Sequence, residues 1–199
     1  PVKQLLPSSN LLTEAQKKAL AEEFSAHLIP EITRQCEALP DTELDLTALD
    51  WFNGRRYPVV NEHVKSAIAG LQLGTTVPQL YKALVLGTAF GARRILESFL
   101  AEGLRIDRII AVGGIAQKSP FVMQILADVL NRPIAVSAST QACAKGAAMY
   151  AAVASGLYDS LQAAQAALSE GVLATYLPEK ARVEKYAALY KNYQQLGEF

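Results

Sequence analysis

The sequence feature that most constrains the fold is a short apolar run followed at once by two glycines and the start of a helix. Residues 108–112, Arg-Ile-Ile-Ala-Val, are typical of a strand covered on both faces, as in a parallel sheet. Gly113 and Gly114 end this strand, and Ser119 with Pro120 supplies the N-cap and first-turn residues of a helix. A strand, a tight turn and a capped helix in this order predict an α/β fold.

Further elements are predicted on both sides of this unit. Apolar side chains at helical spacing predict a long helix that begins near Thr76 and ends at Gly103. Residues 134–136 form a second short strand after an Asn-Arg-Pro turn. Small residues over 142–152 predict a helix that can approach a neighbour closely, and tyrosines at helical spacing over 178–196 predict a helix with one buried stripe.

The first part of the chain, residues 1–40, is predicted to be helical. Thr13 and Gln16 have the spacing of a capping box, in which each side chain satisfies a free N–H group at the helix start. Pro30 either kinks this helix or starts a second one over residues 31–39.

Residues 41–76 differ in composition from the rest of the chain. They contain scattered Asp, Asn, Gly and Pro, and their apolar residues show only weak periodicity. We expect an irregular connection here, with a short helix over residues 62–69 that ends at Gly70. Irregular segments of this length are often functional. The remaining residues, 77–199, are predicted to form the α/β domain.

Composition excludes some classes of function. Lys and Arg together number 19, as do Asp and Glu, so the net charge is zero and no basic excess is available to neutralise nucleic acid. No apolar run reaches the roughly 18 residues expected of a membrane span. Cys36 and Cys143 are far apart and define neither a disulfide framework nor a metal site, so a reducing cytoplasm is expected, with Cys143 buried as inert packing.

The turn at Gly113 and Gly114 is the strongest candidate for a ligand site. Paired glycines let a ligand approach the backbone, and the N–H groups of the following helix start favour acceptor atoms. In open α/β sheets, ligands bind beyond the carboxyl ends of the strands. The spacing is neither that of a Rossmann fingerprint nor that of a P-loop, and the residues fit an ordinary tight turn equally well.

A second candidate is the run that contains Trp51, Asn53 and Arg55. An aromatic pair, a turn and two guanidinium groups lie together here in a segment without regular pattern. This combination suggests residues close to a substrate, and it is also compatible with a purely structural turn.

Three stretches, taken in order, resemble the FGGY family of carbohydrate kinases. They are residues 49–56, Leu-Asp-Trp-Phe-Asn-Gly-Arg-Arg, residues 84–94, with the run Gly-Thr-Ala-Phe-Gly-Ala-Arg, and residues 113–119, Gly-Gly-Ile-Ala-Gln-Lys-Ser. The small-residue helix over 142–148 is similar as well. Leu86 stands where many members carry Glu, which fits the branch that phosphorylates L-ribulose better than the glycerol or xylulose kinases.

The resemblance implies an incomplete C-terminal lobe of an actin-like, ribonuclease H-like ATPase fold, with peripheral helices. Gly113 and Gly114 would pass under the adenosine of ATP, and Gln117, Lys118 and Ser119 would line its edge. The family's phosphate loops, sugar pocket and catalytic Asp are not recognisable in this chain. Mg²⁺ and the sugar would therefore be bound mainly by an N-terminal part, and the chain itself is expected to hold no catalytic residue and no metal ligand.

The resemblance thus predicts ATP-dependent phosphorylation of L-ribulose to L-ribulose 5-phosphate when the chain is joined to that N-terminal part. The expected partners are ATP or ADP and the sugar, with neither nucleic acid nor membrane, and the sequence leaves a homo-oligomer open. Two other hypotheses remain: a catalytically inactive regulatory or interaction module of the same fold, and a different actin-like ATPase.

Overall fold

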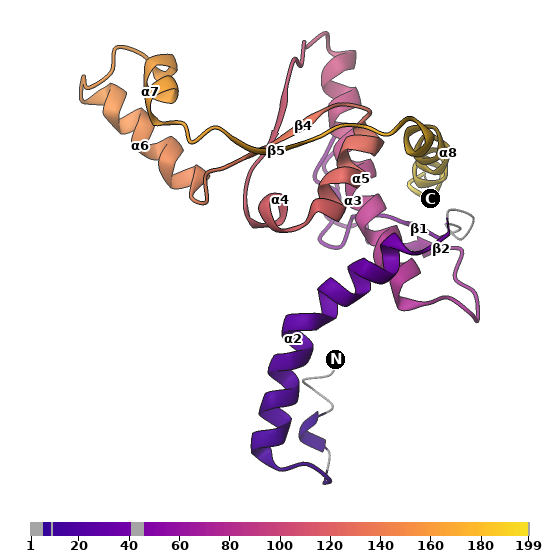
Figure 1. Cartoon of the computed structure of the whole chain (residues 1–199). Helices are drawn as coiled ribbons and strands as arrows, with labels where there is room; N and C mark the ends of the chain where they lie inside the picture. Colours follow the sequence, from indigo (N-terminus) through magenta and orange to yellow (C-terminus); the bar gives the residue numbers. More distant parts are fainter. Residues whose placement is uncertain (1–5, 9, 41–45, 199) are drawn as a thin grey trace. The chain divides into compact units, whose positions relative to one another are not determined.

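The structure is a computed structural model that describes residues 6–8, 10–40 and 46–198 (Figure 1). In chain order its elements are η1 (Leu6–Ser8), α2 (Glu14–Glu37), β1 (Thr47–Ala48), β2 (Ile68–Ala69), α3 (Val77–Ala101), β3 (Ile109–Ala111), α4 (Gly114–Lys118), α5 (Pro120–Leu130), β4 (Ile134–Ser137), α6 (Ala142–Ala154), α7 (Leu161–Leu168), β5 (Val172–Tyr176) and α8 (Lys180–Leu196). The chain packs as two compact units, one of residues 1–46 and 70–83, the other of residues 47–69 and 84–199. The three-part division proposed from the sequence stays a prediction.

Helix α2 is the main element of the first unit. The backbone N–H of Thr13 donates to Oε1 of Gln16 at 2.9 Å, and the N–H of Gln16 donates to the Thr13 hydroxyl, so the predicted capping box is confirmed. The helix continues through Pro30 to Glu37. A second helix over residues 31–39 is therefore wrong, because the helix tolerates the one hydrogen bond that an interior proline removes.

The predicted short helix over residues 62–69 is also wrong. Strand β2 pairs antiparallel with β1, with Thr47 opposite Ala69 and Ala48 opposite Ile68. The backbone N–H of Leu49 extends the pairing by donating to the carbonyl of Ala67 at 2.9 Å. Hydrogen bonds to residues 47–49, far away in sequence, thus outweigh the local helical pattern.

The long helix α3 confirms the prediction for this part of the chain. Thr76 and Gln79 cap its start, with the N–H of Thr76 donating to Oε1 of Gln79 at 2.8 Å. Gly103 follows its end with a φ of 81°, and its N–H donates to the carbonyl of Leu100. A residue with positive φ just past the last turn is a usual way to end a helix, and glycine adopts it without strain.

Strands β3, β4 and β5 form a sheet in that order, with β4 parallel to β3 and antiparallel to β5 (Figure 1). One face packs on α4 and α5, where Ala116, Met123 and Val136 form a buried cluster. On the other face, Ile110 and Val112 are 52% and 55% exposed. The expectation of a strand covered on both faces is therefore wrong for the described residues, in which helices cover only one face.

Helices α3 and α8 pack together with β1 through tyrosines and glycines. Tyr186, Tyr190 and Tyr193 are at most 3% exposed, which confirms the predicted buried stripe. The α3 glycines allow this close approach: a Cβ on Gly87 would lie 2.4 Å from the carbonyl oxygen of Ala48. The α3 backbone therefore reaches the strand only where side chains are missing.

Helix α6 packs against α7, but its small residues do not all face a neighbour. A Cβ on Gly146 would have no heavy atom within 4 Å. Cys143 is exposed, so the prediction of a buried, inert thiol is wrong. None of the helices in the part of the chain that the structure describes is long and apolar enough to cross a bilayer.

Candidate functional site

The turn between β3 and α4 is open to solvent. Gly113 has φ 96° and ψ 176°, a conformation that is accessible essentially only to glycine. A Cβ on Gly113 or Gly114 would have no heavy atom within 4 Å, so the glycines are required by backbone conformation at Gly113 and not by crowding. Ile115 is 69% exposed. A ligand could therefore lie against this backbone without displacing a side chain.

Gln117 ties the turn to the neighbouring strand end. Its Nε2 donates to the carbonyl of Ser137 at 3.1 Å and to the carbonyl of Ser139 at 2.9 Å. Because β3 and β4 are parallel, their carboxyl ends lie at the same edge of the sheet. The Gly113 turn and the loop after β4 thus form two sides of one surface, with Gln117 fixing the spacing between them.

Lys118 is the last residue of α4, and Ser119 follows it directly. The Ser119 hydroxyl accepts a hydrogen bond from the N–H of Val122 at 3.4 Å, so it caps α5 as predicted. Lys118 is exposed, and its ammonium group makes no hydrogen bond or ion pair with any residue that the structure describes. It is a free cation beside the turn.

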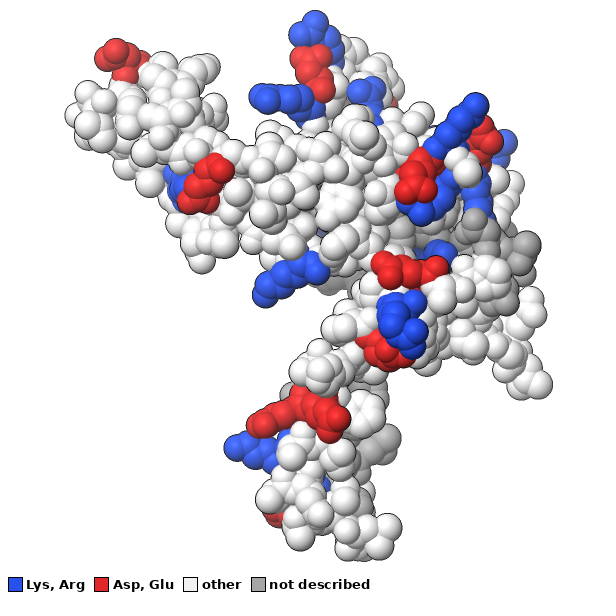
Figure 2. Space-filling model, viewed as in Figure 1, with Lys and Arg blue, Asp and Glu red and all other residues white. Residues whose placement is uncertain are grey.

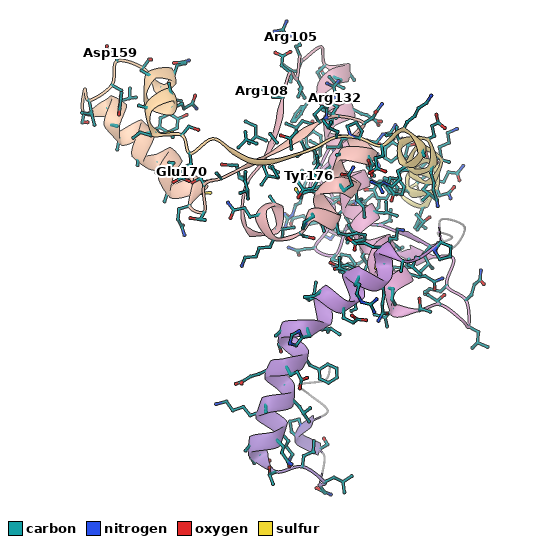
Figure 3. All side chains as sticks on the ribbon, in the orientation of Figure 1. Arg105, Arg108, Arg132, Asp159, Glu170 and Tyr176 are labelled. Carbon is teal, nitrogen blue, oxygen red and sulfur yellow. The ribbon has the colours of Figure 1, made fainter. Side chains whose placement is uncertain are left out.

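An ion pair supports the loop after β4. Lys145 of α6 contacts Glu170. Glu170, labelled in Figure 3, precedes β5. The hydrogen bond from the Lys145 ammonium lowers the pKa of the Glu170 carboxyl, and one from Ser139 adds to this. Glu170 therefore stays ionised and connects the loop, α6 and the start of β5.

Trp51 and Arg55 both contact other parts of the fold. Trp51 is 6% exposed, and its ring lies against Gly197 at the end of α8. The Arg55 guanidinium lies 5.1 Å from the centre of that ring, and its Nε donates to the carbonyl of Val59. Asn53 is exposed. Their closeness to a substrate stays a prediction, and no hydrogen bond among the described residues links the three to the Gly113 turn.

Together these groups form one exposed surface at the carboxyl ends of β3 and β4. It offers main-chain N–H groups at the start of α4, which have no partner inside the helix, and one free cation. No group of three or more His, Cys, Asp or Glu side chains placed to hold a metal ion occurs in the described part of the chain. The sequence pointed to Gly113, Gly114, Gln117, Lys118 and Ser119 but missed Ser139 and the Lys145–Glu170 pair, because contacts between distant segments leave no local pattern.

Comparison with known proteins gives concordant matches. Residues 4–155 match the C-terminal domain of the FGGY family of carbohydrate kinases. The chain is 43% identical to a ribulokinase of Vibrio parahaemolyticus over 89% of its length, and 38% identical to a ribulokinase of Bacillus licheniformis over 90%. It spans about a third of these curated relatives, 31% and 33% of their lengths.

Solved structures agree with the sequence matches. The crystal structure of a xylulose kinase from Rhodospirillum rubrum matches 90% of this chain with a TM-score of 0.74 at 27% identity, and the match covers 35% of that kinase. The predicted fold, the C-terminal lobe of an actin-like ATPase, is confirmed by this likeness.

Proposed function

Because the chain belongs to the FGGY family of carbohydrate kinases, we propose that it is the nucleotide-binding C-terminal part of an ATP-dependent sugar kinase. The proposed reaction is phosphorylation of L-ribulose to L-ribulose 5-phosphate in the cytoplasm, carried out when the chain is joined to an N-terminal part. The choice of sugar is supported by the relatives named ribulokinase at 43% and 38% identity.

The open turn at Gly113 and Gly114 is the observation that carries the nucleotide site. The flat adenine ring of adenosine can lie against backbone that carries no side chains, and this turn offers no Cβ at two successive positions. The loop held by Gln117 would form the second wall. Lys118 and Ser119 would lie at the edge of the adenosine, as the family resemblance implies.

The described residues fit the adenosine part of ATP better than its phosphates. Gly113, Gly114 and the Gln117 tether supply a surface, whereas Lys118 is the single free cation at the turn among the residues described. Bound ATP would supply the phosphoryl group for transfer. Transfer also needs Mg²⁺ and a base or orienting carboxylate in line with the acceptor hydroxyl, and we propose that these come mainly from the N-terminal part. The chain alone is then expected to be inactive.

The proposal is tested on the complete kinase with a coupled assay that supplies ATP and L-ribulose. A Gly113→Ala variant should raise the KM for ATP by about tenfold, because a strain of about 1–3 kcal/mol at this φ and ψ shifts the turn. The KM for L-ribulose should change little. A complete enzyme that is folded but does not phosphorylate L-ribulose contradicts the proposed sugar.

Gly103→Ala is the matched control for the first variant. Gly103 also has a positive φ, 81°, and open space where a Cβ would be, but it follows α3 rather than β3. It should suffer comparable backbone strain and leave the KM for ATP within about twofold. Equal effects of both variants on that KM would mean that strain alone acts, and the nucleotide site at Gly113 would be wrong.

A further inference from the structure

A hollow of about 200 Å³ opens at the end of the sheet where β3 and β4 begin. Its walls include Arg108, just before β3, Arg132, just before β4, and Thr175 on β5. Ile109, Pro133 and Ala135 contribute apolar parts of its lining. This is the opposite end of β3 from the Gly113 turn, so the hollow is separate from the proposed nucleotide site.

Arg132 is held in place by the turn that precedes β4. Asn131 adopts a left-handed conformation with φ 48°, and the N–H of Arg132 donates to the carbonyl of Ala127 at 3.2 Å. One guanidinium nitrogen, Nη1, donates to the carbonyl of Ile106 at 3.3 Å. The remaining N–H groups of Arg132 are left for a ligand, since a guanidinium carries five donors.

Arg108 is the second cation of the hollow and is exposed. Its side chain makes no hydrogen bond or ion pair with residues 6–8, 10–40 or 46–198. The carboxylate nearest in sequence, Asp107, already accepts from Arg105 at 3.0 Å. Two guanidinium groups thus line the hollow. Its one acidic lining residue, Asp107, is already paired with Arg105.

The charges gather visibly at this end of the sheet. Figure 3 places Arg105, Arg108 and Arg132 together there, and Figure 2 shows basic atoms with one acidic group between them at the same place. Arg108 and Arg132 outnumber Asp107, the one acidic side chain in the lining of the hollow. Like charges brought close in a folded chain favour an anion that lies between them.

We propose that this hollow binds the phosphate group of a small metabolite, or free inorganic phosphate. Guanidinium groups match phosphate oxygens with paired hydrogen bonds, and the Thr175 hydroxyl offers a further donor. The size of the hollow sets the class of ligand. At about 200 Å³ it is smaller than the roughly 300–1,000 Å³ of sites that enclose larger ligands, so it suits a phosphate group and not a nucleotide.

The test is a titration of the full chain with inorganic phosphate, followed by backbone amide shifts at constant ionic strength and with saturating ADP present. We expect shifts over residues 106–109 and 132–135, which report this hollow, and none that depend on phosphate at residues 113–119. The proposal would be overturned if added phosphate shifted the amides of residues 113–119 alone, or shifted none. Neither result would contradict the nucleotide site. A parallel titration with succinate that gives equally tight binding would overturn the preference for phosphate.

Two arginine variants separate a defined site from general attraction. Arg108→Gln should weaken phosphate binding by about tenfold or more, the loss expected for charge-assisted hydrogen bonds. Arg108→Lys keeps the positive charge but removes the paired donors of the guanidinium, and it should still weaken binding by about threefold or more. Phosphate binding by Arg108→Lys as tight as that of the wild type would show that only the surrounding field attracts the anion, and the proposed site would be wrong.

Discussion

Replacing Gly91 by alanine should destabilise the second unit, because the added methyl group would take the place of the Asp50 carboxylate. A Cβ built on Gly91 lies 2.2 Å from Oδ2 of Asp50 and 2.9 Å from its Cγ, far inside contact distance. Asp50 cannot move away freely, since its Oδ1 accepts a hydrogen bond from the Tyr193 hydroxyl at 2.7 Å. Tyr193 is 1% exposed, and its burial and then this hydrogen bond raise the pKa of its hydroxyl.

The magnitude follows from three contributions. Forcing an extra methyl group into a packed interior costs about 1–3 kcal/mol. Moving Asp50 leaves the buried hydroxyl of Tyr193 without its acceptor, at a further cost of about 1–3 kcal/mol. Alanine is a better helix former than glycine by about 1 kcal/mol, which offsets part of the loss. We expect a net loss of about 1–5 kcal/mol in the free energy of unfolding.

The assay is urea unfolding of the wild type and of matched variants. Gly146→Ala is the control, because Gly146 also lies inside a helix but has no heavy atom within 4 Å of a Cβ. This control should gain up to about 1 kcal/mol from helix propensity alone. In a Tyr193→Phe background, Gly91→Ala should cost less, because no hydroxyl is left without an acceptor. A Gly91→Ala variant as stable as Gly146→Ala would refute this account of how α3, Asp50 and α8 pack.

Three further predictions concern the site, an ion pair and the thiols. Gln117→Ala removes both hydrogen bonds to the loop after β4 and should weaken ADP binding about threefold to tenfold in a calorimetric titration, at a stability cost of about 1–3 kcal/mol. On α2, hydrogen bonds from Arg34 and, to a smaller extent, from Gln35 lower the pKa of Glu31 from 4.5 to about 2, so an Arg34→Gln variant should raise it part of the way back toward 4.5 in an NMR titration. Because the folded pKa is depressed, the pair's contribution to stability should be complete above pH 4.5 and be lost as the pH falls toward 2. Cys143 should react with a thiol reagent in the folded chain, whereas Cys36, whose thiol pKa is raised by burial, should react only on unfolding; equal rates would contradict this.

Elements governed by local patterns could be predicted from the sequence. The capping box at Thr13 and the helix that ends at Gly103 depend on residues within one or two turns, and both are confirmed. The strand–turn–helix at Gly113 likewise follows from neighbouring residues. In each case the backbone finds its hydrogen-bond partners nearby, so the short-range pattern decides the structure.

Features set by distant partners could not be predicted in this way. Residues 67–69 are extended and not helical because residues 47–49 offer a partner, and nothing local in the sequence indicates this pairing. Exposure of Ile110 and of Cys143 depends on which elements cover them, which is a property of the whole assembly of helices and sheet. At the site, Gln117 could be identified but not its two carbonyl partners, which lie 20 and 22 residues away.

If the Gly113 turn is one wall of a nucleotide site, a bound nucleotide must contact its backbone. The direct measurement is an ADP titration of the full chain followed by backbone amide shifts. We predict shifts that cluster at residues 113–119 and at residues 137–139, the loop that Gln117 holds, even at weak affinity. A folded chain in which saturating ADP leaves both segments unshifted would contradict the nucleotide site.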